Sequence, residues 1–502
     1  MLSLLADRVL AIRTEPDLHD EWCPQLFYYP VYDRLHAMTQ STVPARPLAT
    51  VLCCCLLESV QTRNGMVFVR NEATPISVLS WKSQSNPRKQ YAVTQTDSRI
   101  MDYTNVPRRA VRKYQKDGTR ALLSEGTALF LEDLLFNQIV YKRYLRPRTR
   151  VIGREALFDC DQLYTFETFD GKIPIKEVSP AAPNSMKMVA PGDRFVCEVP
   201  DVTLLGPVGL GVTNENKILA ETVASPAFDT RQSQPRRVGD ALAKSMATNG
   251  VRSTIAAVRP KNNVTPQKII ERGAVIASPW NNYYHWTVEC LIRIRLLERY
   301  AAATGEAPPI LVPETMTPWM VESLELMDYA GPVIKWDGSI IGVETLIMPT
   351  YPDPIPSECF WLRDRMRSNI GSPDIANGSD RIYISREDAT VRDVRNKDRL
   401  QMTLDRYGFD TYILSELSVE EQVGLFATAD VIVGPHGAGL TNCIYAEDVT
   451  IVELLGEQKR GAFFRLSQIL EHEYISVNCD QVGLDLRVNC KQLNEVLDQV
   501  VS

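Results

Sequence analysis

The fold is decided by one stretch near the carboxyl end of the chain, Val431-Ile-Val-Gly-Pro-His-Gly-Ala-Gly-Leu-Thr-Asn-Cys-Ile444. Its β-branched start predicts a buried strand over 431–433, and the break at Gly434-Pro435 predicts a turn into a helix near Gly439. A strand that opens through small residues into a helix leaves main-chain N–H groups unpaired at the positive end of the helix dipole. The stretch therefore predicts a site for phosphate or another anion.

Polar side chains around this turn extend the prediction to a nucleotide. His436 and Asn442 add donors to the same crevice, and Glu453 on the next predicted strand would accept two ribose hydroxyls. The spacing matches neither Gly-x-Gly-x-x-Gly nor a P-loop, so NAD and ATP are not favoured. The alternative is a turn that is rich in glycine only because it is tight.

From residue 266 onward the sequence alternates between predicted strands and helices. The predicted strands are 274–277, 309–312, 344–348, 381–385, 431–433 and 450–455, and the predicted helices are 284–303, 318–329, 360–368, 397–407 and 419–429. Such alternation predicts parallel sheets with helices on both faces. A Pro-rich stretch at 349–356 divides it into two halves.

The first half of the chain is less regular. Residues 1–105 have no clear periodicity and receive no assignment. Residues 106–150 read as a basic amphipathic helical segment, since 107–150 holds eleven Lys and Arg against four Asp and Glu. That profile suits an anionic membrane surface, although helices that pack on the next domain with solvated charges would give the same pattern. Residues 151–240 read as a small β-rich domain whose linker is 229–240, where Arg236-Arg237 follow Pro235.

Composition restricts the class of protein. With 44% hydrophobic and 23% charged residues, the 502-residue chain is typical of a globular protein of two or three domains. A net charge of −7 argues against nucleic acid as a partner. The longest apolar run, 48–57, is too short to span a bilayer. The eleven cysteines lack metal-ligand spacing and predict buried thiols, and the triplet Asp159-Cys-Asp161 is short enough to arise by chance. We expect neither a metal nor a bound cofactor.

A second polar constellation lies on the predicted helix that begins near residue 282. At 100° per residue, Asn282, His285, Glu289 and Arg293 share one quadrant of this helix. The pattern predicts a polar face toward a cleft. A histidine that is only hydrogen-bonded in the core is the alternative.

Three segments of the chain, taken in order, resemble glycosyltransferase family 61. They are Asn281-Asn-Tyr-Tyr-His-Trp-Thr-Val-Glu289, Arg381-Ile-Tyr-Ile-Ser-Arg386 and Gly434-Pro-His-Gly-Ala-Gly-Leu-Thr-Asn442. The resemblance implies an α/β fold of the GT-B type, with two facing Rossmann-like domains. It places the acceptor half at 241–360 and the nucleotide-sugar donor half at 361–502. Because no leader or anchor is evident, we expect a prokaryotic, cytoplasmic member of the capsular-polysaccharide type, peripheral at the inner face of the membrane.

The chemistry that the resemblance implies is inverting O-glycosyl transfer from a nucleotide sugar, most simply a UDP-sugar. The acceptor would be a hydroxyl of a surface glycan, a glycolipid or a protein-linked glycan. Either His285 is the base and Glu289 orients its ring, or the two roles are exchanged; the first is favoured because imidazole titrates near neutral pH. Asn282 and Arg293 would lie on the acceptor side. The expected donor-binding residues are Arg381, Ser385, Arg386, Gly434, His436, Gly437, Ala438, Gly439, Asn442 and Glu453.

Two other classes of protein remain compatible with the sequence. One is a nucleotide-binding Rossmann-type oxidoreductase or regulatory protein. The other is a non-catalytic relative that acts as an assembly subunit, against which the intact His285, Glu289, Arg386 and His436 argue.

Overall fold

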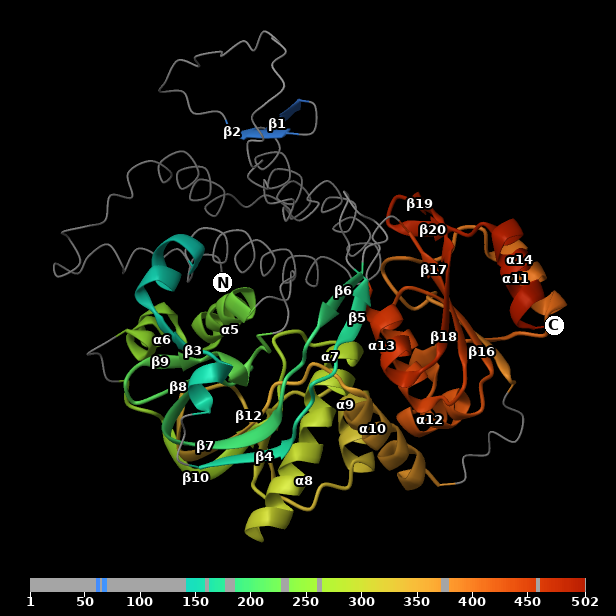
Figure 1. Cartoon of the computed structure of the whole chain (residues 1–502). Helices are drawn as coiled ribbons and strands as arrows, with labels where there is room; N and C mark the ends of the chain where they lie inside the picture. The colour runs from blue at the N-terminus through green and yellow to red at the C-terminus, as the bar shows by residue number, and fades with distance from the viewer. Residues whose placement is uncertain are drawn as a thin grey trace, which may run out of the picture. The chain divides into compact units, whose positions relative to one another are not determined.

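The structure of the protein is a computed structural model that describes residues 60–63, 66–69, 141–158, 162–176, 186–226, 234–259, 264–371, 379–456 and 461–501 (Figure 1). The chain forms two compact units, 1–95 and 96–502. In the first unit, β1 (Val60–Arg63) and β2 (Met66–Val69) form an antiparallel hairpin. Most of the predicted basic segment and the triplet at 159–161 lie outside the described residues.

The larger sheet of the second unit has nine strands and is mixed. Its order is β12 (Val333–Trp336), β11 (Ile310–Pro313), β10 (Lys268–Val275), β13 (Ile341–Pro349), β7 (Arg194–Leu205), β8 (Leu210–Val212), β9 (Lys217–Leu219) and β3 (Arg150–Ile152), with β4 (Leu163–Glu167) beside β7. The first four strands are parallel, and β7 joins them antiparallel to β13. The sheet therefore crosses the boundary predicted at residue 240: strands from the expected β-rich domain pair directly with the acceptor half.

The smaller sheet is entirely parallel, in the order β15 (Asp410–Tyr412), β14 (Arg381–Ile384), β16 (Val431–Pro435), β17 (Thr450–Leu455) and β18 (Glu473–Asn478). Alternate residues point to opposite faces of a strand. Ile432 and Ile451 pack under α12 (Val419–Ala427) and α13 (Ala462–Leu470), whereas Val433 and Val452 pack under α11 (Lys397–Arg406) and α14 (Cys490–Val500). Burial on both faces explains the continuous β-branched runs, and the predicted parallel α/β architecture is confirmed.

Three predictions about local structure need correction. The linker predicted at 229–240 is wrong from residue 234, where α5 (Gln234–Asn249) begins, followed by α6 (Val251–Val258). The single helix predicted over 284–303 consists of α7 (Tyr283–His285), a π-helix at Trp286–Leu291 and α8 (Ile292–Thr304). The helix predicted near Gly439 is the short 3-10 helix η9 (Ala438–Tyr445).

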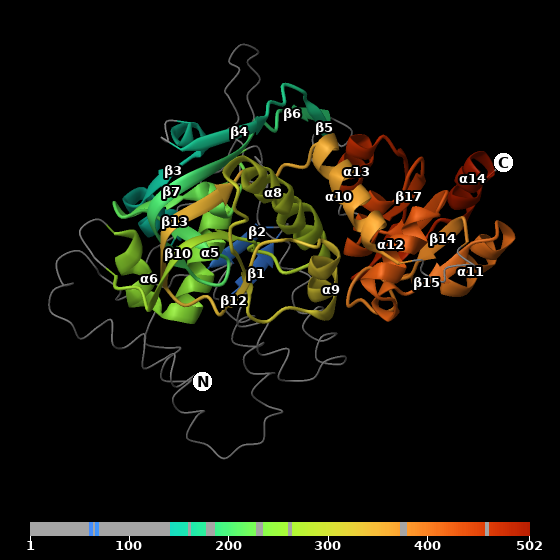
Figure 2. The same ribbon diagram turned by 90° about the horizontal axis from the view of Figure 1, so that it is seen from below.

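One hydrophobic core connects the two sheets. It includes buried residues of α8, α9 (Pro318–Leu326) and α10 (Pro356–Asn369) together with those of α12, α13 and η9. Figure 2 shows α10 beside α13, and α10 also contains the boundary predicted at residue 360. The GT-B arrangement itself stays a prediction.

Two simpler predictions can be compared with the described residues. The six cysteines that the structure describes are all buried. Within the described ranges, no helix combines the length and apolar character needed to cross a membrane.

Candidate functional site

His285 is held at the start of a helix that follows the carboxyl end of β10. The Asn282 side chain caps α7 by accepting a hydrogen bond from the His285 main-chain N–H at 3.1 Å. The imidazole lies between Trp280 and Tyr284, with ring centroids at 4.8 and 5.3 Å. Its Nδ1 lies 2.8 Å from Glu289 Oε1, at ion-pair distance but outside good hydrogen-bond angles. The sequence thus correctly placed His285 and Glu289 together, although the intervening turn is π-helical, a form frequent at functional sites.

Glu289 is buried and held by several donors. Arg237 contacts both carboxylate oxygens, at 2.6 and 3.0 Å, and the Tyr351 hydroxyl donates to Oε2 at 2.6 Å. The Ser278 hydroxyl donates to the same oxygen at 3.1 Å. Burial alone would raise the pKa of Glu289, but Arg237 and His285 outweigh it and hold that pKa well below its ordinary value. Glu289 is therefore a carboxylate whose oxygens are already occupied.

Arg237 is the residue that sequence reasoning missed, because it fell in the supposed linker. Its side chain is fully buried on α5, and the guanidinium lies 4.2 Å from the centroid of the Trp280 ring. A signal was present in the sequence: Val238, Ala241 and Leu242 recur at helical spacing and give α5 a buried apolar face. Arg237 lies four residues before Ala241 and so shares that face.

Arg293 lies beside the Arg237–Glu289 pair, but its guanidinium donates to main-chain carbonyl oxygens. Its guanidinium donates to the carbonyl oxygens of Glu289, Val275 and Ala277 at 2.7, 3.0 and 2.5 Å. It therefore fixes the carboxyl end of β10 against the helix that carries His285. Asn282 and Arg293 both position the predicted site, and contact of either with an acceptor stays a prediction.

A cavity of about 260 Å³ lies at the carboxyl ends of β10, β11 and β12. It shares Trp280 and Ser278 with the surroundings of the His285–Glu289 pair. Its other lining residues are Pro207, Val208, Lys244, Ala277, Asn281, Trp286, Cys290, Pro313, Glu314, Thr315, Met320, Trp336 and Asp337. Ligands of open α/β sheets bind beyond the carboxyl ends of strands, which is where this cavity lies.

The smaller sheet carries a second histidine–glutamate pair. His436 follows β16, and its Nδ1 contacts Oε1 of Glu453 on the neighbouring strand β17. The Tyr474 hydroxyl on β18 donates to the other oxygen of Glu453. Burial, and then Glu453, raises the pKa of Tyr474 well above its ordinary value, which keeps this hydroxyl protonated. Glu453 is fully buried and both its oxygens have partners in the protein, and its expected contact with ribose hydroxyls stays a prediction.

The glycine-rich turn brings Arg386 against the main chain. A Cβ added at Gly437 would lie 1.8 Å from Arg386 Nη1, so only glycine leaves room for this guanidinium. The guanidinium donates to the Val391 carbonyl through Nε and Nη2, each at 3.3 Å, and burial lowers its pKa. Gly434 and Gly439 instead allow close packing against Ile384. Arg386 therefore lies against Gly437, and binding of a diphosphate by this turn stays a prediction.

The remaining predicted donor residues divide into two groups. Ser385 is buried just past the carboxyl end of β14, and Ala438 begins η9, so both lie near the turn. Arg381 starts β14 at the opposite end of the sheet and donates to the Tyr407 carbonyl at 2.8 Å. Asn442 is fully buried and donates to Gln422 of α12 at 2.8 Å. The structure thus places Arg381 and Asn442 in packing roles away from the turn.

Aromatic rings connect the two histidine–glutamate pairs. Tyr284, edge-on to His285, is also edge-on to Phe463 of α13 at 6.1 Å, and Phe463 lies 5.1 Å from His436. Figure 1 shows α7 beside α13. The two histidines therefore belong to one region, reached from both sheets.

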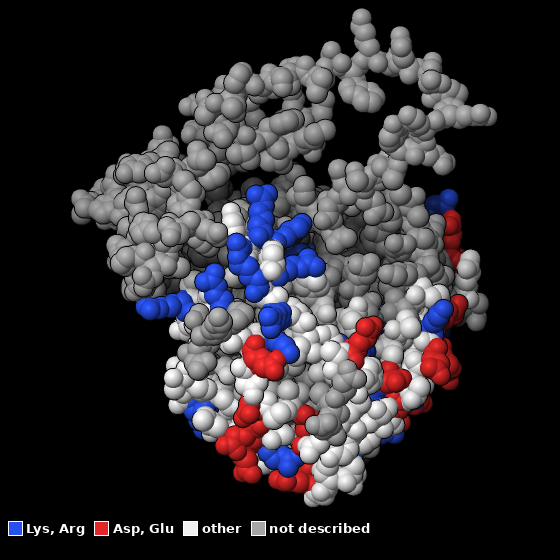
Figure 3. Space-filling model, turned by 60° about the vertical axis from the view of Figure 1, so that its left-hand side comes forward, with Lys and Arg blue, Asp and Glu red and all other residues white. Residues whose placement is uncertain are grey.

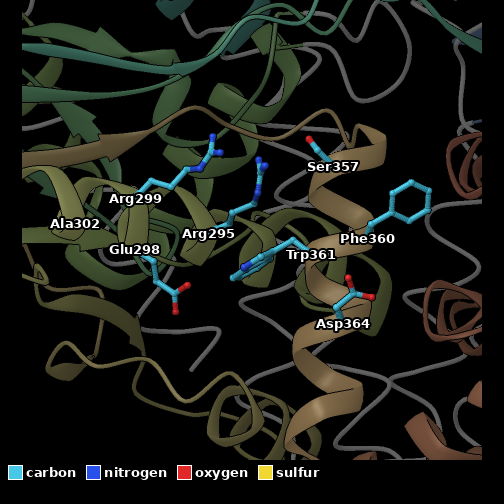
Figure 4. Close-up of a pocket in the computed structure, with 8 residues that line it drawn as sticks. All are labelled: Arg295, Glu298, Arg299, Ala302, Ser357, Phe360, Trp361 and Asp364. Atoms are coloured by element: carbon cyan, nitrogen blue, oxygen red, sulfur yellow. The ribbon is translucent and has the colours of Figure 1, made fainter.

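A larger groove, of about 520 Å³, lies between α8 and α10 (Figure 4). Its lining residues are Arg295, Glu298, Arg299, Ala302, Ser357, Phe360, Trp361 and Asp364. Arg295 pairs with Glu167 at 2.8 Å, and Glu298 pairs with Arg365 at 2.8 Å. Because these charged side chains form ion pairs inside the protein, we interpret the groove as a junction between α8 and α10 rather than as a ligand site.

The comparison with known families agrees with the region that the geometry singles out. Residues 283–452 match the family described as Glycosyltransferase 61. The chain carries a glycosyltransferase domain. The match includes both histidines, Glu289 and Arg386, whereas Arg237, Glu453 and Tyr474 lie outside it. A comparison with curated proteins found no match.

Proposed function

We propose that this glycosyltransferase is an inverting O-glycosyltransferase of the GT-B type. It would move a sugar from a nucleotide sugar, with UDP as the leaving group, to a hydroxyl of a surface glycan, a glycolipid or a protein-linked glycan. The observation that carries the proposal is the His285–Glu289–Arg237 arrangement beside the cavity at the strand ends. Glu289 faces Nδ1 of the imidazole, which leaves Nε2 as the ring atom for proton transfer.

In this mechanism His285 is the general base. Its Nε2 takes the proton of the acceptor hydroxyl while the hydroxyl oxygen attacks the anomeric carbon of the donor. The bond from that carbon to the diphosphate oxygen breaks, and its electron pair leaves with the nucleoside diphosphate. A single displacement of this kind inverts the anomeric configuration.

Glu289 would act through His285 rather than on the substrate. It is already ionised and accepts from Arg237, Tyr351 and Ser278. A carboxylate with a depressed pKa is a weak base, and its attachments hold it in place. The geometry therefore favours Glu289 as the residue that fixes the tautomer and direction of the imidazole, as the carboxylate does in hydrolytic triads.

The diphosphate leaving group would contact the His436–Glu453 pair and the glycine-rich turn. Arg386 supplies a guanidinium whose fork of N–H donors fits a diphosphate, and His436 lies at the same end of the smaller sheet. Main-chain N–H groups around Gly437 to Gly439 add further donors. In this proposal cationic side chains, rather than a metal ion, balance the charge that develops.

The acceptor sugar would enter the cavity that shares Trp280 with His285. Its volume of about 260 Å³ is small beside the 300–1,000 Å³ of typical ligand pockets, which suits one sugar residue. Hydroxyl-binding side chains such as Asn281 and Glu314 line it.

The direct test is turnover of a panel of nucleotide sugars by the purified protein, with the anomeric configuration of the product read by NMR. We expect donor hydrolysis or transfer with a UDP-sugar, inversion in the transfer product, and no binding of NAD in calorimetry. Binding of NAD without any nucleotide sugar would contradict the proposal, and so would a retained anomeric configuration.

A further inference from the structure

The chain carries a positive patch that the glycosyltransferase domain does not include. Residues Lys142, Arg143, Arg146, Arg148 and Arg150 are all exposed, and the exposed carboxylate in residues 141–158 is Glu155. Figure 3 shows a cluster of Lys and Arg side chains on this face, with little acidic surface among them. The concentration is notable because the whole chain has a net charge of −7.

Two buried side chains anchor the segment that carries the patch to the core of the protein. Tyr141 and Leu145, one helical turn apart, are buried in the core formed with α5 and α6. Burial raises the pKa of Tyr141 to about 12. With these two side chains inward, Lys142, Arg143 and Arg146 lie on the outer side of the same turn. β3, which starts at Arg150, continues the segment as the last strand of the larger sheet.

Exposed apolar side chains accompany the charges. Eight large hydrophobic side chains are exposed among the described residues, and three of them lie in 141–158: Tyr144 at 42%, Val151 at 44% and Phe158 at 43%. Tyrosine is enriched where a protein meets the headgroup region of a bilayer. Cations that surround exposed aromatic and aliphatic groups fit a lipid surface better than a soluble polyanion, which would use the charges alone.

We propose that residues 141–151 form a docking surface for a bilayer that contains anionic lipids. Lys142, Arg143, Arg146, Arg148 and Arg150 would contact the headgroups, and Tyr144 would enter the interface. The inference does not depend on the proposed reaction. It gives the enzyme a place beside acceptors that are themselves carried on lipids.

The test is co-sedimentation of the full chain with vesicles of phosphatidylcholine alone or with 30% phosphatidylglycerol. Binding should need the anionic lipid and weaken as salt is raised, since a Debye length of about 8 Å at 0.15 M already screens exposed charges. The triple variant Lys142→Ala/Arg146→Ala/Arg150→Ala should bind about 100-fold more weakly, at roughly fivefold for each cation near an anionic surface. Tyr144→Ser should remove the binding that persists at high salt.

A matched control removes three exposed cations from other places, as Lys268→Ala/Lys335→Ala/Lys491→Ala. This control should bind vesicles like the wild type, and circular dichroism should show that both triple variants are folded. Equal loss in the two triple variants would overturn the proposal, because the effect would then follow net charge alone. Equal binding to neutral vesicles would overturn it, as would binding to dextran sulfate with none to anionic vesicles.

Discussion

The two histidine–glutamate pairs differ in what neutralises the carboxylate. Glu289 has the guanidinium of Arg237 as well as His285, whereas Glu453 has His436 and the neutral hydroxyl of Tyr474 among the residues that the structure describes. A buried carboxylate needs a counter-charge. Arg237 supplies it in the first pair, so Glu289 does not depend on a charge on His285. In the second pair the imidazole of His436 is the contacting side chain that is able to carry that charge, and we expect it to suit an anionic diphosphate.

The largest effect should come from removing the cation of the first pair. Arg237→Met leaves Glu289 buried without its strongest partner, and breaking a buried ion pair typically costs about 3–5 kcal/mol. Chemical denaturation would measure the change. The neighbouring Arg236→Met is the control, because Arg236 is partly exposed and 3.9 Å from Asp240, and it should change the free energy of unfolding by less than about 1 kcal/mol. If both variants lost the same free energy of unfolding, Arg237 would not be the main partner that stabilises buried Glu289.

The Arg237–Glu289 pair should make the free energy of unfolding depend on pH, and the direction of this dependence follows from the pKa of Glu289. The folded pKa of Glu289 lies well below its ordinary value of about 4.5, so its contribution to stability is complete above that pH. The contribution is lost as pH falls through the depressed pKa. The stability advantage of the wild type over Arg237→Met should therefore be greatest near pH 7 and shrink as the pH falls toward the depressed pKa of Glu289. An advantage that grows on acidification would contradict the assigned charge state.

The second pair should be more sensitive to loss of its tyrosine than the first. Tyr474→Phe removes the only hydroxyl donor to Glu453 among the described residues and should cost about 1–3 kcal/mol, the price of leaving a buried acceptor unpaired. Tyr351→Phe should cost less, about 0.5–1.5 kcal/mol, because Arg237 still satisfies Glu289. Thermal unfolding would measure the stability of both variants. A larger loss of stability in Tyr351→Phe than in Tyr474→Phe would contradict this prediction.

A smaller effect is expected from crowding Arg386. Gly437→Ala places a methyl group where the guanidinium lies, and because that side chain can move, the fold should survive while nucleotide affinity falls about tenfold. Gly153→Ala is the control, since nothing lies within 4 Å of its added Cβ. UDP titration by calorimetry would measure both. If Gly437→Ala bound UDP with unchanged affinity, Arg386 would not be part of the donor site.

The sequence predicted most of the smaller sheet, because its strands are buried on both faces and appear as short β-branched runs such as Val431–Val433. It predicted His285 with Glu289 because residues four apart share a helix face under either winding. Arg237 and Tyr351 could not be found in this way, since they reach Glu289 from segments 52 and 62 residues away. The contact of Tyr474 with Glu453 was missed for the same reason: Tyr474 lies on the next strand, and the order of strands in a sheet cannot be derived from local sequence.

In the proposed mechanism His285 acts on the acceptor proton and His436 on the donor diphosphate. The most direct measurement is kcat together with the Kd for UDP in His285→Ala and His436→Ala. His285→Ala should lower kcat by roughly 10²–10⁴-fold and leave the Kd for UDP within about twofold, whereas His436→Ala should raise that Kd by about tenfold or more. A weakened UDP affinity in His285→Ala with turnover retained, or near wild-type turnover in both variants, would contradict the claim.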